Sequence, residues 1–508
     1  MLHRPARPRA EPAPSVSDRS RRKDIRTEGQ GRNAVPCAPR EVPTSPGRLP
    51  GVGHAVSLAR GRLEFLQSLR DQGDVVRVYL GRRPVYVLNS PELVRRLLTA
   101  GENSPGRRHF IHQPRPVPGG ALMSCRLQVH HGRQPTRQPW GQALKRSLRK
   151  DLRESLFRQE GIRRCVDIMS RETETVIGAW SNHRTLRIDR EMHALTLRIA
   201  ARSLCSAEQV RTAADECFRL SPMVGAESDR RAMSPFPWWE KAPTPGNRRF
   251  GRAALRLGQL IDEVVAAYRA DGRDHGDLLS LLLAERDEEG VGRGLADARI
   301  RDEAVAIMRA CTQTTAVALS WLFHELDRHS LVRERLHREL RVIPGAGPAN
   351  RAVPKDIRNL RYTRQVIDET LRLHTPMWLQ VHRITAPLDL GGQALSPGTE
   401  VLLSPTALHR DPAVYPDPMC FDPDRWSPER GRSVGRGAYL PFGIGPRHHV
   451  TEVFARTAMA VVTACVARRW RLTVPPGRGV REVASGSLRP DALRMTARLR
   501  THLAEGQP

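Results

Sequence analysis

Three short motifs in the last third of the chain restrict its fold more than any other feature of the sequence. Glu369 and Arg372 stand three residues apart, so on a helix they share one face and can form an ion pair. A segment at 421–426 that contains Arg425 comes next, and a loop with two glycines at 442–449 ends the series. In isolation, the Glu–Arg pair would be an ordinary surface ion pair. The order of the three motifs favours a shared structural role.

This order resembles that of the cytochrome P450 family. The loop departs at two positions from that family's pattern, Phe-Gly-x-Gly-x-Arg-x-Cys-x-Gly, because His449 replaces the cysteine and Thr451 replaces the last glycine. The other four positions match: Phe442, Gly443, Gly445 and Arg447. The resemblance covers roughly residues 46–500. It implies a mainly α-helical fold with small β-sheets (α+β), formed by one large domain over 46–508, with haem as the cofactor.

The residue at the position of the iron ligand decides which chemistry this cofactor can support. A cysteine thiolate pushes electron density onto haem iron and favours O–O cleavage, whereas a proximal histidine is typical of globins and peroxidases. His449 is the candidate metal ligand, since imidazole is a normal haem ligand. The adjacent His448 is the weaker candidate, because a shift of one residue turns a side chain elsewhere. The alternative is that His449 is what remains after the ligand was lost.

The resemblance also assigns the structural and cofactor-binding residues. Glu369, Arg372 and Arg425 are similar to the family's buried triad, in which two guanidiniums share one carboxylate. Arg383 and Arg447 are similar to the arginines that bind the haem propionates. The alternative for each of these two is an exposed arginine in an arginine-rich chain. The other predicted cofactor contacts are in the loop, at Phe442, Gly443 and Gly445.

A second altered stretch, at 310–315, aligns with the family's oxygen-binding kink, usually Ala-Gly-x-Asp/Glu-Thr-Thr. Cys311 replaces the glycine that leaves room for dioxygen, and Gln313 replaces the carboxylate that delivers protons. An amide cannot donate an acidic proton, so general-acid delivery must weaken. Thr314 remains and can hold a water molecule. We predict Thr314 and Gln313 as catalytic positions; the alternative is simple helix packing by small residues.

Composition limits the partners of the protein. The 508 residues carry a net charge of +29, spread along the chain, and no recognised nucleic-acid module accompanies it. An acidic ferredoxin-type redox partner or a general arginine bias explains the charge better than nucleic acid does. The eight cysteines form no CxxC pair, and no apolar run reaches the roughly 18 residues of a membrane span. We therefore expect a cytoplasmic monomer without membrane attachment.

Local patterns predict the course of the chain. Residues 1–45, rich in Arg and Pro, are expected to be a disordered tail, and residues 126–156 match the family poorly. We expect a helix over 58–72, a hairpin over 74–88, and helices through most of 90–345. Short strands at 388–392 and 400–403 then precede a long helix over 452–468.

Segments at 243–250 and 271–279 are similar to those of bacterial terpenoid oxidases of the pentalenene oxygenase kind. This similarity suggests a small hydrophobic, terpene-like substrate, by analogy alone. Three hypotheses stay open. The chain is a haem oxidoreductase derived from a monooxygenase that tailors a secondary metabolite, a catalytically inactive pseudoenzyme that binds haem or a hydrophobic ligand, or a haem-independent terpenoid cyclase or isomerase.

Overall fold

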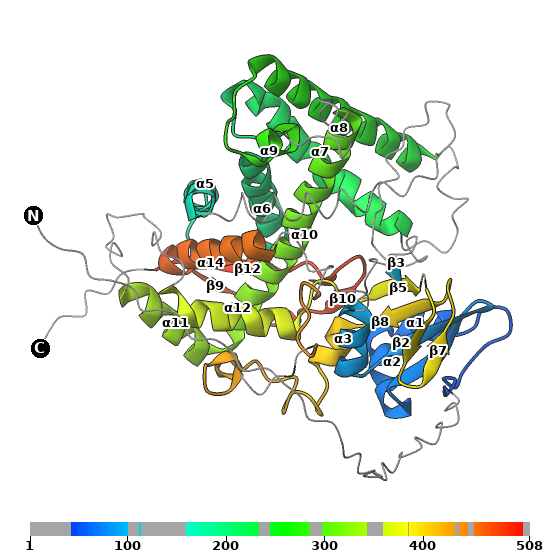
Figure 1. The fold of residues 1–508 in the computed structure, drawn as a ribbon. Helices are drawn as coiled ribbons and strands as arrows, with labels where there is room; N and C mark the ends of the chain where they lie inside the picture. The colour runs from blue at the N-terminus through cyan, green and yellow to red at the C-terminus, as the bar shows by residue number, and fades with distance from the viewer. Residues whose placement is uncertain are drawn as a thin grey trace, which may run out of the picture. The chain divides into compact units, whose positions relative to one another are not determined.

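Most of the described chain is helical, and its sheets are small (Figure 1). The computed structural model describes residues 42–99, 111–112, 159–232, 244–284, 297–342, 359–384, 386–431, 435, 437–444 and 452–500. Residues 41–508 form one unit. The predicted fold class, mainly α with small β-sheets, is therefore confirmed. Residues 1–41 of the tail predicted over 1–45, and the poorly matching region at 126–156, lie outside the described residues.

The predicted hairpin belongs to a five-stranded sheet of order β1-β2-β8-β5-β3. β1 and β2 are antiparallel, and β2 pairs in parallel with β8. The chain reaches this sheet before residue 46, since the Ser45 N–H donates to the Arg77 carbonyl at 2.9 Å. The strands are Val75–Leu80 (β1), Arg83–Leu88 (β2), Ile111–His112 (β3), Gln380–Ile384 (β5) and Glu400–Leu403 (β8).

The helix predicted over 58–72 is wrong as a single element. The segment divides into α1 (Ala55–Arg60), α2 (Arg62–Ser68) and a 3-10 turn (Arg70–Gln72). Gly61 separates the two helices with φ −138° and ψ 78°, which is not a helical conformation. Glycine lacks a Cβ and is the weakest helix former after proline, so the break falls there.

The longest helix, α10 (Asp297–Arg328), contacts α6, α8, α12 and α14 (Figure 1). Leu319, Leu322 and Leu326 recur at helical spacing along it and are buried, which explains why this face points inward. The other helices are α3 (Pro91–Thr99), α5 (Gln159–Gly178), α6 (Ile188–Leu204), α7 (Arg211–Ala232), α8 (Pro245–Asp271), α9 (Leu278–Ala284), α11 (Ser330–Val342), α12 (Arg361–Leu373), α13 (Pro405–His409) and α14 (Glu452–Arg469).

The remaining strands form three smaller sheets within the described ranges. One has the order β4-β12-β9, with β4 at Arg184–Arg187, β9 at Trp470–Thr473 and β12 at Arg494–Leu499. Two hairpins pair β6 (Leu388–Leu390) with β7 (Gln393–Leu395) and β10 (Glu482–Ala484) with β11 (Leu488–Pro490). Among the described residues, no helix combines the length and the apolar character needed to cross a membrane.

Candidate functional site

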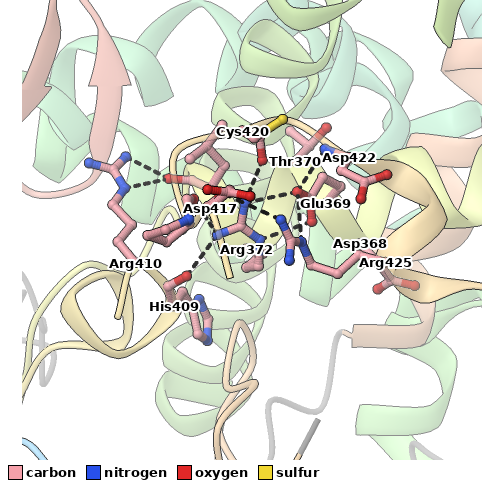
Figure 2. Close-up of polar contacts among 12 residues, drawn as sticks. Asp368, Glu369, Thr370, Arg372, His409, Arg410, Asp417, Cys420, Asp422 and Arg425 are labelled. Atoms are coloured by element: carbon pink, nitrogen blue, oxygen red, sulfur yellow. Dashed lines mark hydrogen bonds and ion pairs between the residues drawn. The ribbon is translucent and has the colours of Figure 1, made fainter. Parts of the chain in front are cut away.

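The predicted triad is centred on one fully buried carboxylate. Glu369 and Arg372 both lie on α12 and are both 0% exposed. Arg372 binds the carboxylate with two parallel hydrogen bonds, Nε to Oε2 at 2.9 Å and Nη2 to Oε1 at 2.8 Å (Figure 2). Such bidentate pairs are stronger than neutral hydrogen bonds and fix the orientation of both groups.

Arg425 has a smaller part in the triad than predicted. Its Nε lies 3.5 Å from Glu369 Oε1 and has no hydrogen-bond partner, so it contributes charge alone to this contact. The carboxylate is instead completed by its neighbours: Trp426 Nε1 donates to Oε2 at 2.9 Å and the Asp422 N–H donates to Oε1 at 3.0 Å. Glu369 thus accepts four hydrogen bonds within the described chain, of which the sequence predicted only those of Arg372.

The other N–H groups of Arg372 connect α12 to the segment that precedes the loop. Nη1 donates to the carbonyls of His409 and Pro418, both at 2.7 Å, and Nη2 donates to the Cys420 carbonyl at 3.1 Å (Figure 2). With the two bonds to Glu369, all five guanidinium donors are used. Breaking any part of this arrangement therefore leaves a buried polar group unpaired, which is destabilising.

His409 extends the arrangement to the start of the loop, and sequence reasoning missed this. Its Nδ1 lies 2.6 Å from Thr375 Oγ1, and its Nε2 accepts a hydrogen bond from the Leu440 N–H at 2.8 Å. An Nε2 that accepts from a backbone N–H carries no proton. Burial, together with the charge of Arg372, lowers the pKa of His409 to about 3 and keeps the ring neutral.

The described part of the loop comprises residues 442–444. Phe442 is 8% exposed, and the Arg456 guanidinium lies over its ring at 5.4 Å from the centroid. Gly443 has φ +75°, in the left-handed region that side chains disfavour. The predicted cofactor and metal positions Gly445, Arg447 and His449 lie outside the described residues, as do His448 and Thr451. Their roles stay predictions.

The altered stretch of α10 is half-buried where the predicted catalytic residues stand. Thr314 Oγ1 donates to the carbonyl of Ala310, one turn earlier, at 3.1 Å. This bond occupies the hydroxyl proton, so the oxygen's lone pairs are what Thr314 can offer to a water molecule or ligand. Gln313 is half-buried beside it, and the Cys311 side chain is 6% exposed.

Arg383 lies on β5 and is exposed, whereas the preceding His382 is 1% exposed. Within the described chain its guanidinium makes one hydrogen bond, from Nε to the Gly398 carbonyl at 3.3 Å. Within the described chain, the terminal nitrogens of this guanidinium have no carboxylate partner. They can therefore bind an acidic group such as a propionate. The donor chemistry at this position therefore fits the predicted cofactor.

A second buried ionic network was not predicted. His374, which follows α12, lies between two carboxylates, with Nε2 2.9 Å from Glu325 Oε1 and Nδ1 3.0 Å from Glu482 Oε1. Arg410 Nη1 also donates to Glu482 Oε2, at 2.8 Å. Trp321 stacks on the imidazole at 4.0 Å. Burial acts to raise the pKa of Glu482, but the hydrogen bonds from His374 and Arg410 outweigh it and lower this pKa to about 2.

Known proteins are similar to this chain in sequence and in fold. The family model "Cytochrome P450" matches residues 43–496. Cyclooctatin synthase of Streptomyces melanosporofaciens is 38% identical over 89% of this chain and 94% of its own, and pentalenene oxygenase of Streptomyces avermitilis is 32% identical over 90% and 97%. The crystal structure of the cytochrome P450DA heme domain has the same fold, with a TM-score of 0.73 and 23% identity over 91% of this chain and 98% of that one.

The helical body with its small sheets and the buried Glu–Arg network define the fold of a helix-dominated haem protein. The chain belongs to the cytochrome P450 family. Haem is the cofactor that this family and fold indicate.

Proposed function

We propose that this protein is an oxidoreductase derived from a monooxygenase, which modifies a small hydrophobic terpenoid of secondary metabolism and holds its haem iron through His449. The observation that carries the proposal is the similarity to Streptomyces relatives, one of which is named Cyclooctat-9-en-7-ol 5-monooxygenase and is 37% identical over 89% of this chain. His449 supports a histidine-ligated haem, because imidazole is a normal axial ligand.

Different residues of the chain have different roles in such a site. When bound, haem supplies redox chemistry at its iron. Arg383 and Arg447 bind its carboxylates. Thr314 presents hydroxyl lone pairs, because its proton is donated to the Ala310 carbonyl. Gln313 orients polar groups but delivers no acidic proton. We infer that the site favours peroxide-driven oxidation or a redox-neutral rearrangement over activation of dioxygen.

The second candidate function is a pseudoenzyme that binds haem or a hydrophobic ligand without turnover. The observation that favours it is the coincidence of three changes at working positions, Cys311, Gln313 and His449. A cyclase or isomerase without haem remains the third hypothesis. An acidic ferredoxin as electron donor, a cytoplasmic location and a monomeric state stay predictions.

The absorption spectrum of the purified protein tests the proposal. We expect a histidine-type Soret band and, for the ferrous carbon monoxide complex, a maximum at about 420 nm and not at about 450 nm. A band at about 450 nm would mean that a distant cysteine ligates the iron. A protein that takes up no haem favours the cyclase. Haem uptake without product from terpenoid substrates, with peroxide or with ferredoxin and its reductase, favours the pseudoenzyme.

A further inference from the structure

Cationic side chains converge where α11 approaches the sheet β4-β12-β9. Arg333, His337 and Arg341 recur every four residues and so line one face of α11. α11 packs on α14, α14 contacts β9, and β9 pairs with β12 (Figure 1). We name the following residues the arginine cluster: Arg333, His337, Arg341, Arg471, Arg498 and Arg500.

The contacts within the arginine cluster bring like charges together. Arg471 on β9 stands directly opposite Arg498 on β12. Like charges at directly opposite positions of an antiparallel pair are destabilising. Arg500 Nη1 lies 2.6 Å from His337 Nδ1 and donates to the Ala467 carbonyl at 2.9 Å. Two arginine side chains are thus crowded on the strands, and a third is directed towards α11.

Little negative charge balances these guanidiniums within the described chain. None of the five arginines forms an ion pair there; the carboxylates of Asp327 and Glu334 act on Arg333 only from beyond ion-pair distance, and Asp327 also accepts from the Val474 N–H at 2.8 Å. Burial, and next the charge of the neighbouring arginines, lowers the pKa of Arg500. The same causes, burial first and then Arg500 and other cluster arginines, lower the pKa of His337 to about 3. The histidine is therefore a neutral acceptor and adds no positive charge.

The arginine-rich composition does not account for this arrangement. Three partly buried arginines elsewhere in the described chain do have carboxylate partners: Arg187 with Asp189 at 2.7 Å, Arg198 with Glu172 at 2.8 Å and Arg301 with Asp262 at 2.6 Å. The arginine cluster differs in that the charges acting on Arg500 and His337 are those of other arginines, which repel one another. Such repulsion is relieved by a bound anion, and planar guanidiniums match the oxygens of a phosphate in pairs.

We propose that the arginine cluster binds a multivalent oxyanion of the phosphate class, either free phosphate or a phosphate ester. The anion lies against the exposed guanidiniums of Arg341, Arg471 and Arg498, with Arg333 and Arg500 beneath them. The site does not depend on the proposed oxidation, because none of its residues is among the predicted haem or catalytic positions.

The test measures thermal unfolding of the full chain while inorganic pyrophosphate is titrated, against sodium chloride at equal ionic strength. The informative variant is Arg341→Gln/Arg471→Gln, which removes two exposed cations from the arginine cluster. The matched control is Arg478→Gln/Arg489→Gln, which removes two exposed cations elsewhere and changes the net charge equally. Parallel titrations with inorganic phosphate and glycerol 3-phosphate compare a free phosphate with a phosphate ester. The one that binds more tightly identifies the class of ligand.

We expect pyrophosphate to raise the unfolding midpoint of the wild type and of the control. We expect the cluster variant to bind it at least about tenfold more weakly, since each lost contact is a charge-assisted hydrogen bond. The proposal is overturned if sodium chloride has the same effect as pyrophosphate, or if the cluster variant and the control respond alike. The readout does not use haem absorbance, so failure of the anion-binding proposal does not contradict the proposed oxidation.

Discussion

The network around Glu369 and the altered stretch of α10 are both buried or half-buried, but they differ in how closely they keep the family's pattern. Glu369 and Arg372 are at the family's positions, and every guanidinium donor of Arg372 is used. In α10, Cys311 and Gln313 replace residues on which the family's oxygen chemistry depends. We expect the first region to determine whether the chain folds and the second to determine what it can catalyse. If so, the chemistry of this fold can change without loss of the fold.

The largest expected effect is in the first region. Glu369→Ala leaves Arg372 and Arg425 without their shared carboxylate in a buried place, and we expect a loss of about 3–5 kcal/mol in the free energy of unfolding. Because typical domains are marginally stable, soluble yield should fall sharply. Soluble yield and melting temperature measure the effect, with Glu92→Ala in an exposed ion pair as the control. Unchanged melting of Glu369→Ala would show that this network does not hold the fold.

The second prediction concerns substitutions at the predicted iron ligand and in α10, which should change the chemistry and leave the fold intact. His449→Cys should give the ferrous carbon monoxide complex a thiolate-type band but only weak oxygenation, because Gln313 still delivers no proton. Adding Gln313→Glu should then raise product formation with a ferredoxin and its reductase by about 10²-fold, the lower range of general-acid catalysis. Gln313→Leu in the same background is the control. Vigorous oxygenation by His449→Cys alone would show that the altered stretch of α10 does not limit turnover.

The third prediction concerns acid stability. The pKa of Glu482 is depressed to about 2, so its ionic contacts contribute stability above the ordinary carboxylate pKa and lose it as the pH falls towards 2. Glu482→Gln should therefore lower the free energy of unfolding at pH 7 by about 3 kcal/mol, and the difference should shrink below about pH 4.5. Urea unfolding at several pH values measures this, with exposed Glu64→Gln as the control. A difference that does not change with pH would exclude an ionic origin.

The sequence predicted the part of the Glu369 network that depends on local spacing. Glu369 and Arg372 are one helical turn apart, so the pattern of the helix is enough. It did not predict that Thr314 donates to the Ala310 carbonyl one turn earlier. The hydrogen bonds from Trp426 and the Asp422 N–H to Glu369 depend on how the segment at 421–426 packs against α12, and sequence spacing does not reveal that packing.

The network around His374 could not be predicted, because Glu325 and Glu482 are 49 and 108 residues away along the chain. Tertiary packing alone brings them together. The helix predicted over 58–72 failed for the opposite reason. There the prediction followed the apolar periodicity on both sides of Gly61, whereas the structure follows the local preference of the glycine and breaks the helix.

The smallest expected effect measures what one neighbour contributes to the network around Glu369. Trp426→Phe removes the indole donor to Oε2 but keeps most of the aromatic packing, and the carboxylate keeps its other three hydrogen bonds. We expect a loss of about 1–2 kcal/mol, since hydrogen bonds to charged groups contribute more than neutral ones. Trp470→Phe is the matched control, because its indole donates to the neutral Ile177 carbonyl at 3.1 Å. Urea unfolding should show the larger loss for Trp426→Phe; equal losses would mean that the carboxylate's charge adds nothing to the strength of this bond.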